Sequence, residues 1–165
     1  MSPATIRPAR IEDVPAASRL AAALVRQHHA FDPDRFMLVE PVEEGYARFL
    51  STQVDREGVV LLVAELDGTV VGYLLGGLEG RDWMLLLDDC GMIHDVYVDA
   101  SARGRGIGTA IVEEAVARLV AMGVPRVVLS TAWPNEAARR LFAKLGFRET
   151  MVEMTREAGG SHHSG

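Results

Sequence analysis

Apolar residues along this chain follow two kinds of pattern. Residues 59–66 are almost continuously apolar and rich in β-branched side chains, which predicts a buried strand. Asp67-Gly68 comes next and is typical of a tight hairpin turn, so residues 70–78 are expected to form the returning strand. Residues 106–122 instead repeat apolar side chains every three or four positions, which predicts a helix with a broad buried face.

The same patterns extend along most of the chain and predict a fold class. Residues 83–87 can be interpreted either as a strand extension or as part of an acidic turn. Alternating strands and helices predict an α/β fold in three layers, a mixed, twisted sheet of about six to seven strands flanked by helices. The further elements expected are strands at 6–9, 93–98, 126–132 and 147–154, and helices at 14–29, 42–54 and 135–145.

Length and composition indicate an ordinary globular protein. The 165 residues suit one domain, expected at 1–157, and 48% hydrophobic with 24% charged residues argue against general disorder. The small polar residues 158–165 are expected to form a disordered tail, either native or left by cloning. With the single cysteine Cys90, no membrane-spanning run and no signal-peptide core at the start, we expect a cytoplasmic protein without a membrane partner.

The net charge of −6 is concentrated in one window. Residues 79–99 hold six acidic residues against the single basic Arg81, so most of the excess negative charge lies there. This distribution argues against a nucleic-acid partner, which requires a basic surface. Asp88 and Asp89 are therefore candidates for binding a cationic substrate, although a solvated acidic loop explains them equally well.

A glycine-rich run, Arg103-Gly104-Arg105-Gly106-Ile107-Gly108, lies between a predicted strand and a predicted helix. Glycines allow an anion to approach the unpaired N–H groups at a helix N-terminus, and the arginines add positive charge. The run therefore predicts a pyrophosphate site. A Walker loop is excluded because the only lysine is Lys144, and the dinucleotide fingerprint fails at Thr109.

The glycine-rich run resembles the acetyl-CoA signature Arg/Gln-x-x-Gly-x-Gly/Ala of the GNAT superfamily of N-acetyltransferases. Residues 135–147, NEAARRLFAKLGF, are similar to a second motif of that family, N-x-x-A-x-x-L-[YF]-x-x-x-G-F. The resemblance implies a GNAT-like fold and an acetyl-CoA-dependent N-acetyltransferase. The acetyl group is expected to move by direct attack, since no covalent enzyme intermediate is needed when both substrates are held together. A small-molecule amine is expected as the acceptor on the strength of the acidic window alone.

The resemblance also implies which residues contact acetyl-CoA. Backbone groups of the predicted strand would bind the pantetheine arm, backbone amides of the glycine-rich run would bind the pyrophosphate, and the second motif would line the channel. The implied set is Val96, Tyr97, Val98, Arg103, Gly104, Arg105, Gly106, Ile107, Gly108, Thr109, Asn135, Ala138 and Phe142.

The reaction needs a general base, because an alkylamine with a pKa of about 10.4 is protonated at neutral pH. His94 and Asp95 are the candidates, since they lie on the strand that leads into the glycine-rich run. Adjacent strand residues point to opposite faces, so one of the two is expected to face a given cleft. Diamine acetyltransferases of the superfamily carry a Glu-Asp pair here, which favours Asp95 with His94 close behind. A structural role is the alternative for both residues. Asp95 would then hydrogen-bond to neighbouring backbone, and His94 would lie in the core.

The acid that protonates the leaving thiolate is less obvious. Many family members have tyrosine where this chain has Phe142, whose ring carries no such proton and fits an apolar helix face. Tyr97, Ser130, Thr131 or water could replace it, or the thiolate could leave unaided, since a thiol has a pKa of about 8.5. Phe142 therefore leaves one alternative from another class open, an acyl-CoA-binding sensor with little catalysis. A protein or peptide N-acetyltransferase is a second alternative, which would need an open groove rather than a roofed pocket.

The remaining candidate residues have weaker support for a functional role. In an unbroken strand Cys90 and His94 would be about 13 Å apart, which argues against a Cys–His pair. Residues 28–34 contain histidines and aspartates but match no metal-ligand spacing, so no metal is expected. Phe31 is expected to contribute to an apolar roof over the acceptor site. A homodimer is common in the family, and the sequence leaves it open.

Overall fold

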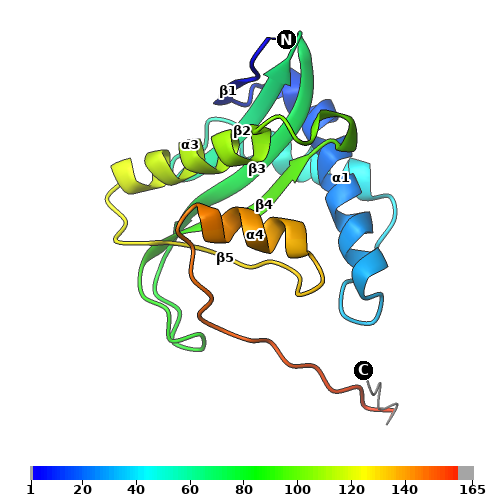
Figure 1. The fold of residues 1–165 in the computed structure, drawn as a ribbon, viewed down its shortest axis with the longest axis vertical. Coiled ribbons are helices and arrows are strands. Elements are labelled where there is room, and N and C mark those ends of the chain that lie inside the picture. Colours follow the sequence, from blue (N-terminus) through cyan, green and yellow to red (C-terminus); the bar gives the residue numbers. More distant parts are fainter. Residues whose placement is uncertain (1, 160–165) are drawn as a thin grey trace.

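The computed structural model describes residues 2–159 and contains a mixed five-stranded sheet with strand order β1-β2-β3-β4-β5 (Figure 1). Neighbouring strands from β1 to β4 are antiparallel, and β5 joins β4 in parallel. The α/β class is as predicted, but the sheet has fewer strands than the six to seven expected. The strands are β1 (Thr5–Pro8), β2 (Val59–Leu66), β3 (Thr69–Glu79), β4 (Cys90–Val98) and β5 (Val127–Leu129).

Helices cover both faces of the sheet (Figure 1). One face packs against α1 (Val14–Phe31) and α2 (Val42–Ser51), and the other against α3 (Ile107–Ala121) and α4 (Glu136–Lys144). Two short 3-10 turns, η1 (Ile11–Asp13) and η2 (Ala100–Ala102), connect β1 to α1 and β4 to the glycine-rich run. No helix in the described part of the chain combines the length and apolar character needed to cross a bilayer.

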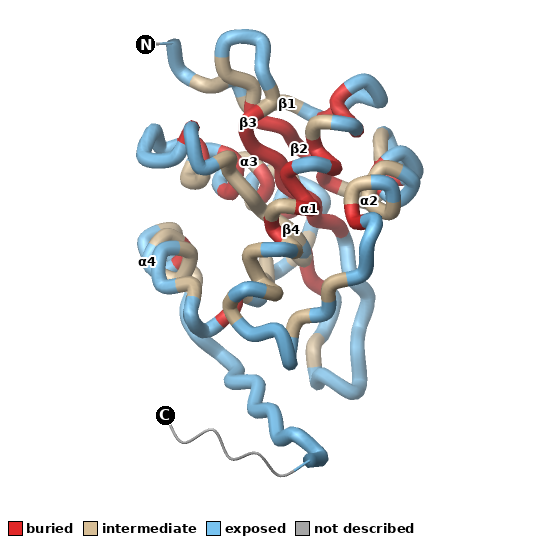
Figure 2. Tube along the Cα trace, turned by 90° about the vertical axis from the view of Figure 1, so that its right-hand side faces the viewer, coloured by how far each residue is buried: buried red, intermediate tan, exposed pale blue. Residues whose placement is uncertain are grey.

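Each face of the sheet has its own apolar core, and Figure 2 shows the buried residues running through the centre of the sheet. The alternation of side chains along β2 and β3 divides these strands between the two cores. The core under α3 includes Leu62, Leu74, Ile93, Ile111 and Leu119, and the core under α1 and α2 includes Leu20, Leu50, Val63, Tyr73 and Leu75.

The expected strand at 147–154 is absent, and this prediction is wrong. A β-strand is defined by its hydrogen bonds to a neighbouring strand. Residues 147–154 make no such bonds, although their sequence favours an extended backbone. Strand β5 is shorter than the expected 126–132, because it pairs with β4 over three residues only. Residues 83–87 form a tight turn closed by a bridge between Asp82 and Leu87. The tail predicted at 158–165 lies outside the described residues, apart from its first two.

Candidate functional site

Strand β4 contains a bulge at His94. Asp95 pairs with Leu75 and Ile93 pairs with Gly76, so His94 is one extra residue between two consecutive pairs. Glycine is required opposite the bulge, because a Cβ on Gly76 would lie 2.7 Å from the carbonyl oxygen of Met92. The extra residue shifts the alternation of side chains by one position.

The bulge corrects the expectation that His94 and Asp95 face opposite sides. Ile93 packs in the core under α3, whereas Asp95 bonds to Tyr73 in the core under α1 and α2. His94 bonds to Glu79. Glu79 and Tyr73 are six residues apart on β3, so their side chains point to the same face of the sheet. Both candidate bases therefore lie on the α1–α2 face of the sheet.

Asp95 accepts hydrogen bonds from two tyrosines. Oδ2 of Asp95 accepts a hydrogen bond from the hydroxyl of Tyr73 on β3. It accepts a second one from the hydroxyl of Tyr46 on α2, at 3.3 Å. Burial, with the neighbouring Asp95 charge, raises the pKa of both phenols well above their ordinary value. The tyrosines therefore remain protonated donors, and Asp95 connects α2 to the sheet.

His94 has a more open environment than Asp95. Its Nε2 lies 3.0 Å from Oε1 of Glu79, and both side chains are about half exposed. The other ring nitrogen, Nδ1, has no hydrogen-bond partner among the described residues. A carboxylate that holds one nitrogen and leaves the other accessible is a suitable arrangement for an imidazole base.

Beyond the bulge, β4 and β5 separate. The two strands pair only from Gly91 to Ile93 on β4, so no strand of the described chain pairs with residues 95–98 on that side. The N–H of Asp99 points toward β3, because it donates to Val71 at 2.7 Å. Since alternate residues of a strand point their N–H groups to opposite edges, those of Val96 and Val98 point into the opening left by β5. These residues belong to the strand whose backbone groups the family resemblance implies for the pantetheine arm.

The glycine-rich run forms the turn that leads from η2 into α3. Gly104 and Gly106 have φ values of 75° and 74°, a conformation that other residues adopt only with strain, and a Cβ on either would meet no other atom within 4 Å. Gly108 serves a different purpose, because its Cβ would lie 3.2 Å from Leu141 where α4 packs against α3. No acceptor among the described residues binds the N–H groups of residues 104–109. These amides are therefore available to an anion at the helix N-terminus.

The two arginines of the run differ in their contacts. Arg103 turns back on β4, where its Nε donates to the carbonyl of Val98 at 3.1 Å and its guanidinium lies over the Tyr97 ring, 5.3 Å from the centroid. Arg105 instead lines a cavity of ≈ 250 Å³ beside Gly104 and Ile107. The cavity is completed by Ser2, Pro3, Ala4 and Leu66.

The second motif forms the start of α4. Asn135 is the N-cap of this helix, and its side chain accepts from the N–H of Ala138 at 3.2 Å. Ala138 is half-buried against the core under α3, and Phe142 is buried there with its ring against Phe147, 5.9 Å between centroids. Phe142 thus occupies the apolar position that its helix face predicted.

Other candidates lie away from the bulge. Asp88 and Asp89 precede β4 in the hairpin turn, about 20 Å along the strand from Asp95, and Asp88 is paired with Arg81 at 2.9 Å. Phe31 is the last residue of α1, in an aromatic cluster with His28. Cys90 is buried, and burial raises the pKa of its thiol. No group of three or more metal-binding side chains converges within residues 2–159.

Three residues of this site were not predicted from the sequence: Tyr46, Tyr73 and Glu79. Tyr73 carried a signal, because a tyrosine within an apolar strand needs a partner for its hydroxyl. Tyr46 and Glu79 carried none, since the first depends on the packing of α2 and the second on the bulge.

An open strand edge beside a helix N-terminus built for an anion defines a class of fold that binds an extended, phosphate-bearing cofactor along a sheet. Residues 20–147 match the Acetyltransferase (GNAT) family. The chain belongs to this family, whose fold binds acetyl-CoA or CoA.

Solved structures agree with this assignment. A mutant of the BH1408 protein from Bacillus halodurans is 25% identical, with a TM-score of 0.81 over 93% of this chain and 98% of that chain. Aminoglycoside N-acetyltransferase AAC(6')-Iy in complex with CoA has a TM-score of 0.74 at 17% identity, over 96% of this chain and 97% of that one. A ribosomal-protein-alanine N-acetyltransferase from Brucella melitensis biovar Abortus 2308 has a TM-score of 0.65 at 16% identity, over 93% and 98%. The last two likenesses establish the fold alone.

Proposed function

We propose that this protein is an acetyl-CoA-dependent N-acetyltransferase that acts on the primary amine of a small molecule. The observation that carries the proposal is the separation of β4 and β5 beyond Ile93, which opens a strand edge directly toward the N-terminus of α3. An acyl donor bound along this edge would present its reactive end near the bulge, where His94 and Asp95 lie.

The residues present fit acetyl-CoA. The N–H groups of Val96 and Val98 point into the opening, the amides of 104–109 bind no acceptor among the described residues, and a Cβ on Gly104 or Gly106 would meet no other atom within 4 Å. These groups would hold the pantetheine arm and the pyrophosphate. Acetyl-CoA supplies an acetyl group as a thioester, which an unprotonated amine attacks with release of a free thiol.

We assign the general base to His94. Nδ1 of its imidazole is accessible, while Glu79 holds Nε2 and fixes the ring. Asp95 is the weaker candidate, because two tyrosine hydroxyls already occupy its Oδ2. His94 would accept the proton that the ammonium group of the substrate must lose before it can attack.

Asp95 has a positioning role in this proposal. Its bonds to Tyr73 and Tyr46 fix the strand directly after the bulge, and thereby the orientation of His94. Position 142 is a phenylalanine, which has no hydroxyl to protonate the thiolate. The thiolate would therefore leave unprotonated or take a proton from water or Tyr97. Because α1 and α2 pack over this face, a small amine reaches the bulge more easily than a folded protein does.

The test is thiol release from acetyl-CoA in the presence of polyamines, aminoglycosides, amino acids and short peptides. Release with one class of small amine is the expected result and identifies the acceptor class. Release with peptides alone would replace the small-molecule acceptor by a peptide. Tight binding of acetyl-CoA with no release across the panel would favour an acyl-CoA sensor.

A further inference from the structure

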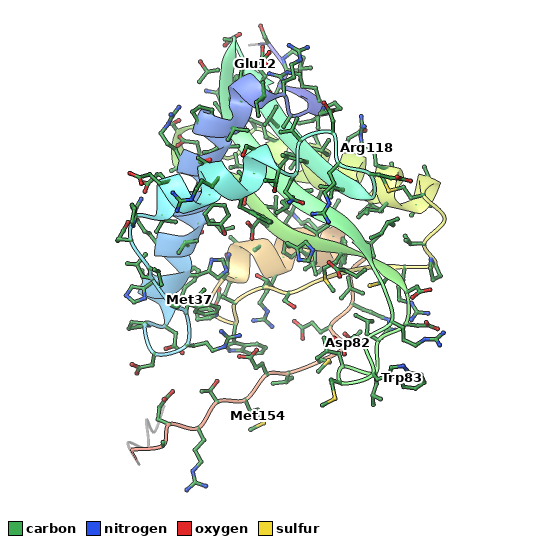
Figure 3. The ribbon with its side chains drawn as sticks, turned by 180° about the vertical axis from the view of Figure 1, so that it is seen from behind. Glu12, Met37, Asp82, Trp83, Arg118 and Met154 are labelled. Atoms are coloured by element: carbon green, nitrogen blue, oxygen red, sulfur yellow. The ribbon has the colours of Figure 1, made fainter. Side chains whose placement is uncertain are left out.

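A cavity of ≈ 300 Å³ lies at the edge of β2, where β1 leaves the sheet. Strand β1 pairs with β2 as far as Pro8, and the N–H of Ala9 makes the last bond, to the carbonyl of Leu61 at 2.9 Å. The cavity is lined by the end of β1, the start of β2, the turn after α2 and the C-terminal end of α3. Figure 3 shows Arg118 of α3 in the upper part of the molecule, with Trp83 and Met154 at the opposite end.

Two backbone groups of β2 at this cavity lack a partner. The carbonyl of Gly58 accepts from Leu78 on β3 at 2.8 Å, so the backbone groups of Val59 and Leu61 point to the opposite edge. Among the described residues, the N–H of Leu61 and the carbonyl of Val59 have no hydrogen-bond partner. Leu61 is only 7% exposed, and a buried N–H without an acceptor is unfavourable unless a ligand or water binds it.

Two charged side chains line the same cavity. Nε of Arg118 donates to Glu114 at 2.7 Å, and its Nη groups have no hydrogen-bond partner within residues 2–159. Asp55 lines the cavity from the turn after α2, and no side chain of the described chain pairs with its carboxylate. The cavity therefore combines a free donor and a cation with a free acceptor and an anion.

This combination matches the two charged groups of a free α-amino acid. A carboxylate accepts hydrogen bonds from an N–H and a guanidinium, and an ammonium group donates to a carbonyl and a carboxylate. The volume is at the lower end of the roughly 300–1,000 Å³ that is usual for ligand sites, which suits a molecule of this size. Pro8, Ala121 and Met122 add apolar surface, which favours an aliphatic side chain.

We propose that this cavity binds a free aliphatic α-amino acid. The carboxylate of the ligand accepts from the N–H of Leu61 and the guanidinium of Arg118. Its ammonium group donates to the carbonyl of Val59 and the carboxylate of Asp55. In the sheet order, β3 and β4 lie between β2 and the opening beside β5, so this site is separate from the edge assigned to acetyl-CoA. The inference goes beyond the proposed function and does not depend on it.

Calorimetric titration of the full-length protein with L-leucine tests the proposal. Saturable binding of one leucine per chain is the expected result. L-leucinamide, which lacks the carboxylate, and isocaproate, which lacks the amine, should each bind more weakly by roughly tenfold or more. An absence of leucine binding overturns the proposal, and so does equal binding of isocaproate, because the site then does not recognise the ammonium group.

Variants of the two charged residues test the assignment of the site. Arg118→Gln should weaken leucine binding by roughly tenfold or more, because it removes a charged donor. Asp55→Asn should also weaken it, and asparagine tolerates the left-handed backbone at this position, where φ is 55°. Arg140→Gln is the matched control, since it removes a similar Arg–Glu pair, with Glu136 on α4, outside the cavity. Full affinity in both Arg118→Gln and Asp55→Asn overturns the proposal.

Leucine is itself an amine, so binding at the cavity must be distinguished from binding as an acetyl acceptor. The amide resonance of Leu61 in heteronuclear NMR spectra should shift on addition of leucine, in the wild type and in His94→Gln alike. It should not shift at the same leucine concentration in Arg118→Gln, with the far-UV circular dichroism unchanged. Leucine binding that is lost in His94→Gln and retained in Arg118→Gln would assign leucine to the acceptor site and overturn the proposal.

Discussion

The hydroxyl of Tyr73 donates a hydrogen bond to Oδ2 of Asp95 across two neighbouring strands, at a point where Tyr73 has no exposed surface. Tyr46 adds a second hydroxyl to the same oxygen from α2. This contact holds the strand beside the bulge and joins a helix to the sheet.

Tyr73→Phe should lower the free energy of unfolding by about 1.5–3 kcal/mol, the range for a hydrogen bond to a charged group. Tyr46→Phe should cost less, because Tyr46 is only half-buried and water can replace its hydroxyl. Urea unfolding of the two variants measures the difference. Equal losses in both would mean that burial of the hydroxyl does not determine its contribution.

High pH should weaken this cluster. The pKa values of Tyr73 and Tyr46 are raised in the folded state by burial and by Asp95, so the folded protein retains protons that the unfolded chain loses above about pH 10. The stabilisation is complete below that pH and is lost as the pH rises further. Urea unfolding across this range should show a steeper decline for the wild type than for the double variant with Tyr46→Phe and Tyr73→Phe.

Low pH acts on a different ion pair. The Arg7 guanidinium bonds both oxygens of Asp13 at 2.6 and 2.9 Å and lowers the pKa of that carboxyl. The contribution is present above the unfolded pKa of about 3.9 and is lost as the pH falls below it. Asp13→Asn should cost about 1–3 kcal/mol at neutral pH and reduce the acid sensitivity. Glu12→Gln, an exposed neighbour, is the matched control and should change neither.

Gly106→Ala should weaken CoA binding. Its φ of 74° strains an alanine by about 1–2 kcal/mol, which disfavours the turn that leaves the amides of 104–109 available to an anion. Calorimetric titration with CoA should show an affinity lower by roughly tenfold or more. Gly45→Ala in α2 has open space around it and ordinary backbone, so it should leave CoA affinity unchanged. An unchanged affinity in Gly106→Ala would argue against the anion site.

His94→Gln should lower kcat/KM by roughly 100- to 10,000-fold, the usual contribution of a general base. Glu79→Gln should give a smaller decrease, because it only orients the ring. Glu57→Gln, in the exposed turn before β2, serves as the control. A large loss in Asp95→Asn with His94→Gln still active would transfer the role of base to Asp95.

Periodicity predicted much of this architecture, including β2, the hairpin at Asp67-Gly68 and α3 nearly to their observed limits. The strand expected at 147–154 failed because pairing depends on a partner edge, which local composition does not report. The glycine-rich run was recognisable because a left-handed backbone conformation favours glycine, which is visible in the sequence. The environment of His94 was not, because the bulge arises from the register of β4 against β3.

The bulge also works as a phase shift along β4. If β4 instead paired with β3 without the bulge, so that His94 lay opposite Leu75, Asp95 would turn toward α3 and the N–H groups of Val96 and Val98 would turn back to β3. Deleting residue 94 would have a different effect, because Ile93 and Asp95 would then pair with Gly76 and Leu75 in ordinary alternation and everything after the bulge would keep its direction. Related sequences with a gap at this position should therefore lack the candidate base while keeping Asp95 and the backbone donors in place.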